Sequence, residues 1–367
     1  MSLPEPIEPE QAEPEPDPPE AGALFRAEIY EQPQALLRLL EHEADYARVA
    51  ELARERGASI VRMVGHGSSD NAASYGVYAF GLRPRWTAFR DSISLTVHYG
   101  TKLDMTGTTA IGLSQSGRTP DVVTYLERAR GNGAFTVALT NNPGSDLATV
   151  AEAVLPLAAG DEQAVAATKT YLNQIAALGL LASHAAGTGQ RFAASIRLVA
   201  EELGDLIPEL ERRVIPVASA FSFTGRMFVI GRGPEFASAR EIALKLLETT
   251  RIAAEPMTAT DLAHGPVAAL DPLFPVWAIA SNDATLSAVV EGAQRARETG
   301  AVLIASGVAA NAIPDAAYRL PLPDLGSSLL EPLLSVVPGQ LFAWALARAR
   351  GLDPDRPRGL SKVTLAR

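Results

Sequence analysis

Apolar and polar positions along the chain recur in one order: a short apolar run, a turn of small polar residues, and then a helical pattern. The stretch TTAIGLSQSGRTPDVVTYLERA (108–129) shows this order most clearly. Its β-prone run, Thr108 to Leu113, stops in Ser-Gln-Ser-Gly-Arg-Thr-Pro, and a helical spacing of apolar residues begins near Asp121. The run AFTVALT (134–140) leads through NNPGSDLATVAEA into another turn and then a helix or an acidic surface segment. Both stretches predict a strand that feeds a helix.

The order occurs a third time in SIVRMVGHGSSDNAASYGVYAF (59–80), after a helical segment over about 23–55. Strands that alternate with helices pair in parallel and are joined by right-handed crossovers. The first half of the chain therefore predicts an α/β domain with a doubly wound parallel sheet.

The same order starts again in the second half. Three stretches there parallel the three of the first half, in the same sequence: 226–248, 274–296 and 301–307. A long helical region, about 163–213, lies between them. We therefore predict two similar α/β domains of the flavodoxin-like, doubly wound type. The expected segments are a tail, two domains and a second tail: residues 1–22, 23–200, 201–350 and 351–367.

The first 22 residues differ in composition from the rest of the chain. They hold seven prolines, seven acidic residues and no basic residue, which gives them −7 of the total charge of −10. Such a segment is expected to stay extended and solvated, as a disordered acidic tail. The remaining charge of −3 comes without any cluster of Lys and Arg, so a nucleic-acid partner is not expected.

Composition also excludes several kinds of site. The chain has no cysteine, which excludes disulfides, cysteine metal sites and thiol nucleophiles. Hydrophobic residues make up 47% of the chain, yet no apolar run approaches the roughly 20 residues that span a bilayer. The N-terminus lacks the basic and then apolar pattern of a signal peptide. A cytoplasmic protein without a membrane partner is expected.

The turn at 114–119 has the chemistry of an anion site. Ligands of open parallel sheets bind beyond the carboxyl ends of the strands, and the first N–H groups of a helix favour an anion. Gly117 permits a tight turn. Five hydroxyls from two adjacent turns would surround the anion: Ser68, Ser69, Ser114, Ser116 and Thr119. Neither turn has a P-loop lysine or a G-x-G-x-x-G order, so the predicted ligand is a phosphate monoester on a small molecule.

The alternative is that these hydroxyls only cap a helix and tighten a turn. One or two hydroxyls would suffice for that, whereas five occur in two neighbouring turns. The equivalent turn of the second half, Ser-Asn-Asp-Ala-Thr (281–285), contains an acid and no glycine, which suits a phosphate poorly. Only the first half is therefore predicted to hold the anion.

The helical pattern over 241–250 carries a polar stripe on an otherwise apolar helix. Glu241, Lys245 and Glu248 follow one another at spacings of four and three, and therefore share one face. The commonest structure for such residues is an exposed ion pair on the solvent face. The apolar neighbours favour instead a stripe that lines a cleft, where a carboxylate with a raised pKa can move protons at neutral pH.

The chain has five histidines. His42 and His184 lie in helical patterns and are interpreted as structural or surface residues, whereas His66 lies in a Gly-rich turn near the predicted ligand. His264 lies in a loop before Gly-Pro, and His98 follows an apolar stretch. No pair has the spacing H-x-x-H or H-E-x-x-H, so neither a metal site nor another cofactor is expected.

Several motifs in this order resemble one known family. They are EIYEQP, SQSGRTPD, NNPGSDLA, AGDEQAVAATKTY, EIALKLLE, LAHGPVAALD and DPDRPRGLSKVT. Together they resemble the isomerase half of glucosamine-6-phosphate synthase (glutamine–fructose-6-phosphate aminotransferase), which is a pair of sugar isomerase (SIS) domains. The resemblance covers about residues 23–367. It implies a tandem SIS fold, with the sugar-phosphate loop in the first domain and a catalytic helix in the second.

The resemblance also implies where the substrate binds. The sugar phosphate is expected on Ser69, Ser114, Gln115, Ser116 and Thr119. Further substrate or supporting positions are expected at Gly67, Ser68, Val165, Ala167 and Arg358.

Four residues match catalytic positions of the family. Glu248 matches the carboxylate that carries a proton between C1 and C2 of the sugar, and Lys245 supports the open-chain sugar. Lys362, on the C-terminal catalytic tail, matches the lysine that forms a Schiff base with the ketose. His264 matches the ring-opening histidine, which reaches into the neighbouring subunit's site and so implies a homodimer.

The chain departs from the synthase at several points. It shows neither a glutaminase domain nor its nucleophilic cysteine, so glutamine-fed synthesis is not expected unless a separate protein delivers ammonia. Arg118 replaces the family's usual acid, and Ala167 stands where the synthase has a serine that touches the sugar. Both changes bear on which sugar phosphate is bound.

The resulting functional prediction is a phosphosugar aldose–ketose isomerase and hydrolase of amino sugar metabolism. The expected reaction is that of an SIS-type glucosamine-6-phosphate deaminase, which forms fructose 6-phosphate and ammonia. One alternative is a deglycase or an isomerase of another amino sugar or sugar phosphate. Another is a sensor that binds a carbohydrate derivative without catalysis, although a sensor needs no set such as Glu248, His264 and Lys362.

Overall fold

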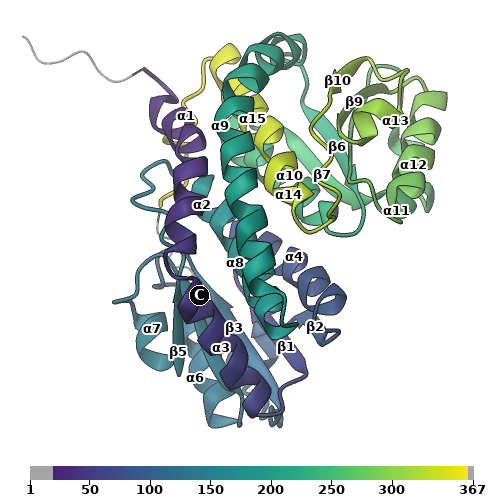
Figure 1. The fold of residues 1–367 in the computed structure, drawn as a ribbon. Helices are drawn as coiled ribbons and strands as arrows, with labels where there is room; N and C mark the ends of the chain where they lie inside the picture. The colour runs from purple at the N-terminus through teal and green to yellow at the C-terminus, as the bar shows by residue number, and fades with distance from the viewer. Residues whose placement is uncertain (1–19, 363–367) are drawn as a thin grey trace, which may run out of the picture.

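The computed structural model describes residues 20–362 and has two lobes, each built around a five-stranded parallel sheet (Figure 1). Residues 1–19 of the tail expected over 1–22, and the last five residues, 363–367, lie outside the described part of the chain. The predicted fold class, two similar doubly wound α/β domains, is confirmed.

The sheet of the first lobe has the order β2-β1-β3-β4-β5, with every neighbouring pair parallel. The strand at its centre, β3, is buried along its whole length, and β4 beside it is too. The strand bounds are β1 Ile60–Val64, β2 Thr87–Arg90, β3 Thr108–Leu113, β4 Phe135–Thr140 and β5 Ala153–Pro156.

The sheet of the second lobe has the order β10-β9-β8-β6-β7, also all parallel. Read from β7, the chain visits the positions of this sheet in the same sequence as in the first sheet. The internal repeat is therefore a repeat of topology. The strand bounds are β6 Arg226–Gly231, β7 Ala253–Thr258, β8 Pro275–Ala280, β9 Val302–Gly307 and β10 Tyr318–Leu320.

Helices flank both sheets (Figure 1). Those up to the end of the first sheet are α1 Ala23–Tyr30, α2 Gln32–Leu40, α3 Glu43–Glu55, α4 Ser68–Leu82, α5 Ile93–Val97, α6 Pro120–Gly131 and α7 Asp146–Val150. The two long helices between the sheets are α8 Lys169–Ala185 and α9 Gly189–Ala220. Those of the second half are α10 Glu235–Thr250, α11 Ala259–Ala263, the 3-10 helix η1 Pro266–Ala269, α12 Leu286–Glu298, α13 Ala309–Ala312, α14 Glu331–Ser335 and α15 Val337–Ala349.

The four strands that the sequence did not predict, β2, β5, β7 and β10, are all edge strands. An edge strand is only partly covered, so it lacks the continuous apolar run that marks a central parallel strand. The strand β7 illustrates this, because its burial alternates and it contains Glu255 and Pro256. The segment after NNPGSD likewise forms a five-residue helix followed by the edge strand β5.

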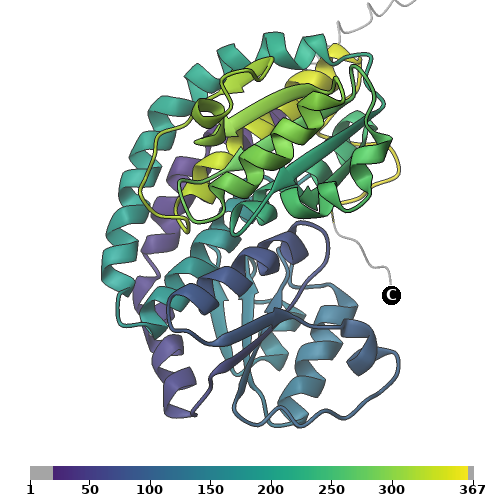
Figure 2. The same cartoon turned by 90° about the vertical axis from the view of Figure 1, so that its right-hand side faces the viewer.

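One hydrophobic core runs through both lobes. It joins strand residues of the first sheet, such as Val61, to strand residues of the second, such as Trp277, through α8, α9, α10 and α15. Each lobe has a second, smaller core on the other face of its sheet. The helix α9 runs along both lobes (Figure 2), across the boundary predicted between residues 200 and 201. The lobes are thus fixed together by shared apolar packing.

Residues 20–22, which we expected to belong to the tail, lie against the C-terminal segment. The Gly22 N–H donates to Asp353 at 3.2 Å, the carbonyl of Gly22 accepts from Trp344, and Glu20 pairs with Arg348. Within residues 20–362, no helix combines the length and the apolar character needed to cross a membrane.

Candidate functional site

A cavity of about 560 Å³ lies where the two lobes meet, at the carboxyl ends of β1 and β3. Its walls come from the turn after β1, the turn after β3, the loop before α8, the helix α10 and the C-terminal segment. This is the place at which open parallel sheets bind ligands. The predicted site residues that line it are Gly67, Ser68, Ser69, Ser114, Gln115, Ser116, Thr119, Val165, Ala167, Lys245, Glu248 and Lys362.

Hydrogen bonds within the turn between β3 and α6 fix its shape; we call this turn, residues 114–119, the hydroxyl cup. The Gly117 N–H donates to Ser114 Oγ at 3.1 Å, and Ser114 Oγ lies 3.0 Å from Thr119 Oγ1. Gly117 has φ +66°, and a Cβ there would meet Ser145 Oγ at 1.9 Å, so only glycine fits. Thr119 precedes Pro120, the first residue of α6, so the turn lies at the N-terminus of that helix.

The hydroxyl of Ser69 is oriented by a residue of another element. Gln174 on α8 donates from Nε2 to Ser69 Oγ at 2.9 Å, and both side chains are buried. A hydroxyl that already accepts one hydrogen bond is left with its own proton to donate. Both turns therefore bring hydroxyls to the wall of one cavity at the N-terminus of α6, and this arrangement suits a phosphate monoester.

The polar stripe of α10 is buried between the lobes. The side chains of Glu241 and Lys245 are 0% and 1% exposed, and Glu248 is 22% exposed at the cavity wall. Lys245 Nζ lies 2.6 Å from Glu248 Oε2 and 3.3 Å from Glu241 Oε1. The exposed ion pair considered from the sequence is thus excluded, and two residues of the stripe, Lys245 and Glu248, line the cavity.

Burial and charge act in opposite directions on this stripe. Burial alone would lower the pKa of Lys245, but the two carboxylates outweigh it and raise that pKa above its ordinary value. Burial raises the pKa of Glu241, although Lys245 lowers it in part. Lys245 is therefore a permanent cation beside Glu248.

Contacts across the lobe interface join this stripe to the first domain. Ser68 Oγ donates to Glu241 Oε1 at 2.8 Å, and Asn71 Nδ2 donates to Glu241 Oε2 at 2.9 Å. Lys245 Nζ in turn lies 3.2 Å from Ser68 Oγ. The helix α10 is apolar around most of its circumference because it packs against α4, α14 and α15 as well as its own sheet.

Lys362 reaches the cavity from the C-terminal segment. Its Nζ lies 2.7 Å from Glu162 Oε2 and 2.7 Å from the carbonyl oxygen of Ala164. Burial would raise the pKa of Glu162, but the charge of Lys362 and hydrogen bonds from Thr170 and Thr168 outweigh burial and lower it. Glu162 is therefore a charged partner that holds Lys362 at the cavity.

Two of the predicted residues do not join this group. His264 is exposed in the second lobe and does not line the cavity. Arg358 is exposed and lines a separate pocket of about 420 Å³, which shares only Glu248 and Leu360 with the cavity. The predicted roles of both residues remain predictions.

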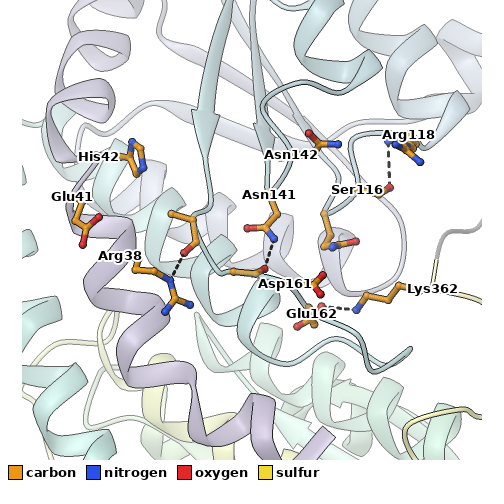
Figure 3. Close-up of a pocket in the computed structure, with 13 residues that line it drawn as sticks. Arg38, Glu41, His42, Ser116, Arg118, Asn141, Asn142, Asp161, Glu162 and Lys362 are labelled. Carbon is orange, nitrogen blue, oxygen red and sulfur yellow. Dashed lines mark hydrogen bonds and ion pairs between the residues drawn. The ribbon is translucent and has the colours of Figure 1, made fainter. Parts of the chain in front are cut away.

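Another pocket, of about 640 Å³, shares part of the 114–119 turn with the cavity (Figure 3). Gln115, Ser116, Glu162 and Lys362 belong to the walls of both. Arg118, by contrast, is an exposed residue of the same turn that lines this pocket and not the cavity (Figure 3).

Three supporting residues were not predicted from the sequence. Glu162 lies in the quoted motif AGDEQAVAATK between Asp161 and Gln163, and nothing in that run marks it as the buried partner of Lys362. Gln174 follows Asn173 in α8, where an amide pair within an apolar stretch is a usable signal for buried hydrogen bonds. Asn71 gives no such signal, because its role depends on contact with the other lobe.

The corresponding corner of the second lobe is closed. Glu235, at the start of α10, is fully buried and accepts hydrogen bonds from Ser281 at 2.8 Å and Ser335 at 2.7 Å. Burial raises its pKa, although these hydroxyls lower it in part.

Within residues 20–362 no group of three or more metal-ligating side chains has the geometry for a metal ion.

Comparison with known proteins gives consistent results. The model of the SIS domain matches the chain twice, at residues 61–184 and 221–345. The glutamine–fructose-6-phosphate aminotransferase of Aeropyrum pernix is 34% identical over 350 residues, which cover 92% of this chain and 56% of that protein. The chain thus spans about half the length of the curated relatives it matches.

Two solved structures extend the comparison. A protein of Silicibacter pomeroyi DSS-3, described as a candidate phosphosugar isomerase, is 32% identical with a TM-score of 0.81, and the match covers 90% of this chain and 99% of that one. The glucosamine-6-phosphate deaminase of Thermotoga maritima has a TM-score of 0.74 at 20% identity, covering 94% of this chain and 100% of that one. The second likeness shows a shared fold alone.

Proposed function

The chain belongs to the SIS domain family, and from that premise we propose that it is a phosphosugar aldose–ketose isomerase that deaminates glucosamine 6-phosphate. The products would be fructose 6-phosphate and ammonia. The observation that carries the proposal is the position of Glu248, an ion-paired carboxylate in the same cavity as the hydroxyl cup. A binding site alone would not need a base opposite the phosphate position.

The proposed reaction begins with the phosphate on the 114–119 turn and the open-chain aldehyde directed toward α10. Glu248 removes the proton from C2 and returns it to C1, while a proton passes from the amine nitrogen to the oxygen on C1, so that the amino-aldose becomes a C2 imine with a hydroxymethyl group at C1. The Lys245 ammonium, 2.6 Å from Glu248, balances the negative charge of this end of the cavity.

Release of nitrogen completes the reaction. The amine of Lys362 displaces ammonia from the C2 imine to form a Schiff base, and water hydrolyses that Schiff base to the ketone of fructose 6-phosphate and the free amine. Overall, one water is consumed and one ammonia is released. Glu162, 2.7 Å from Lys362, is placed to hold the lysine while the bond forms.

His264 would act from a second copy of the chain, since it does not line its own cavity. In this proposal the imidazole protonates the ring oxygen of the pyranose and opens the ring. The protein would then work as a homodimer, and a dimer-breaking change near residue 264 would lower the turnover of the closed sugar.

The proposal is tested by measuring ammonia and fructose 6-phosphate released from glucosamine 6-phosphate by the purified protein. The wild type should release both in equal amounts, and Glu248→Gln should lose at least about 10³-fold in kcat while still binding the sugar phosphate. Glu255→Gln, which neutralises an exposed carboxylate on β7, is the matched control and should be as active as the wild type.

The outcomes separate the candidate functions. Interconversion of sugar phosphates without release of ammonia would identify an isomerase of another substrate. A thermal shift on binding the sugar phosphate, with no turnover of any sugar phosphate tried, would contradict the enzymatic proposal and favour a sensor.

A further inference from the structure

The cavity is short of positive charge for the ligand proposed for it. Its charged lining residues are Asp121, Glu162, Glu248, Lys245 and Lys362. Lys245 pairs with Glu248, and Lys362 pairs with Glu162, so each ammonium group is already matched by a carboxylate. The carboxylate of Asp121 remains as an excess negative charge before a phosphate monoester adds about two more.

Asp121 makes the shortage of positive charge greater, because its carboxylate lies beside the proposed phosphate position. Asp121 is the second residue of α6, two residues after Thr119, and it is only 8% exposed. A carboxylate this close to a phosphate dianion repels it unless a cation lies between or beside them. Helix N–H groups and hydroxyls carry only partial charges and do not remove that repulsion.

Two histidines converge on the carboxylate of Asp121. His66 Nε2 lies 3.9 Å from Asp121 Oδ2, and His98 Nε2 lies 3.7 Å from the same oxygen. His66 belongs to the turn after β1 and lines the cavity together with Ser69 and Thr119. His98 is the residue that follows α5, and it does not line the cavity.

We propose that His66 is the cation of the phosphate site: binding of the sugar phosphate takes up a proton on His66, and Asp121 and His98 hold its ring in place. The inference rests on the proposed binding of a phosphate monoester at the 114–119 turn. His66 is the one cavity-lining group, among the described residues, that can gain a positive charge near neutral pH.

The sign of the pH dependence follows from this coupling. A bound phosphate favours the protonated imidazole, so affinity is highest at the acidic end of the range in which histidine titrates and falls as the pH rises. The other titratable groups that line the cavity are Asp121, Glu162, Glu248, Lys245 and Lys362. His66 is the one imidazole among the described residues that line the cavity, and comparison of the wild type with His66→Gln isolates its part of the pH dependence.

The test is calorimetric titration with glucitol 6-phosphate, an open-chain sugar phosphate without a carbonyl group, which cannot be turned over. Wild type and His66→Gln are compared between pH 6 and pH 8.5 in buffers of different ionisation enthalpy. Ionisation of the ligand affects both proteins equally, so the ratio of their association constants reports His66 alone. We expect the ratio of the wild-type association constant to that of His66→Gln to fall about tenfold from pH 6 to pH 8.5. Only the wild type should take up more protons on binding than the ligand itself takes up.

Arg118→Gln is the matched control, since it removes a cation from the same turn that faces the neighbouring pocket (Figure 3). It should keep the pH dependence of the wild type. His98→Gln should reduce that dependence a few-fold, because His66 keeps Asp121 but loses the second imidazole that orders the carboxylate.

Two results would overturn the inference. Equal pH dependence in wild type and His66→Gln, with binding retained, would show that His66 does not carry the charge and would leave the proposed function standing. No binding of glucitol 6-phosphate by the wild type at any pH would remove the phosphate site itself. His66 is more than half exposed, so a comparison of unfolding midpoints without ligand suffices to show that the variant is folded.

Discussion

At the end of the first strand of each lobe, a glycine packs against the fourth residue after it. A Cβ on Gly65 would meet Ser69 at 2.8 Å, and a Cβ on Gly231 would meet Glu235 at 2.7 Å. Ser69 and Glu235 therefore occupy equivalent positions in the two halves. Ser69 presents a hydroxyl to the cavity, whereas Glu235 is buried and accepts hydrogen bonds from hydroxyls of its own lobe.

The comparison extends to the next turn. Ser114 and Ser281 each follow the strand beside the first one, but Ser116 in the first half corresponds to Asp283 in the second. In the second half the carboxylate of Glu235 takes the hydrogen bonds of the hydroxyls, whereas in the first half Ser69 and Ser114 line the cavity, where the proposed function places an external anion. The duplicated backbone keeps its topology while a few side chains differ between the two corners.

The largest effect is expected when the acid of the second half, Asp283, is introduced at the equivalent position of the first half. Ser116→Asp copies Asp283 at a half-buried wall position, and its carboxylate would repel the phosphate. We expect kcat/KM for the sugar phosphate to fall at least about 100-fold. Ser116→Asn, of similar size and uncharged, should lose about tenfold or less, and an equal loss in both variants would contradict the electrostatic explanation.

A second change breaks the polar stripe of α10, whose residues Lys245 and Glu248 line the cavity next to the turns of the first half. Lys245→Met leaves Glu241 buried without its cation, and loss of one partner of a buried pair costs about 3 kcal/mol or more of unfolding free energy. Denaturant unfolding measures this loss. The double variant Glu241→Gln with Lys245→Met should recover most of the stability, and failure to recover it would show that packing of the lysine stem matters more than its charge.

A third prediction concerns the closed corner of the second half. Burial raises the pKa of Glu331, which is 3% exposed and lies near Glu235, from 4.5 to about 7. The folded state therefore binds a proton more tightly than the unfolded chain, so this residue's contribution is full below about pH 4.5. It is lost as the pH rises through about 7, a difference of up to about 3 kcal/mol.

Glu331→Gln should abolish that part of the pH dependence and be more stable than the wild type at pH 8. Unfolding free energies at pH 5 and pH 8 provide the measurement. A wild type and variant with parallel pH profiles would contradict a proton on Glu331 in the folded state.

The smallest effect is expected at the residue that the second half uses in place of Ser116. Asp283→Ser should leave kcat/KM within about twofold of the wild type, because Asp283 caps its own turn through Thr285 and does not line the cavity. A large loss of activity would mean that the second corner also contributes to substrate binding.

The sequence predicted the fold well where strands are buried and less well at the sheet edges. Runs such as Thr108–Leu113 are apolar on both faces, so their pattern is unambiguous, whereas β7 alternates and carries a proline. The hydroxyl turn and the stripe of α10 could also be predicted, because their chemistry lies in short contiguous motifs.

Contacts between distant segments could not be predicted in the same way. Glu241 accepts hydrogen bonds from Ser68 and Asn71, which lie in a helix about 170 positions earlier. Glu162 pairs with Lys362, which lies 200 positions later in the chain. Their partners depend on how the lobes meet, and no local pattern encodes that. His66 was placed near the ligand from its turn alone, but its convergence with His98 on Asp121 required the fold.

The most direct test of the central claim is a crystal structure of Glu248→Gln soaked with glucosamine 6-phosphate. We expect a phosphate on the hydroxyls of Ser69, Ser114 and Thr119, with C1 and C2 of the open sugar beside residue 248. We also expect no phosphate at Glu235. A phosphate bound in the pocket of Arg38 and Arg118, or at the closed corner of the second lobe, would contradict this expectation.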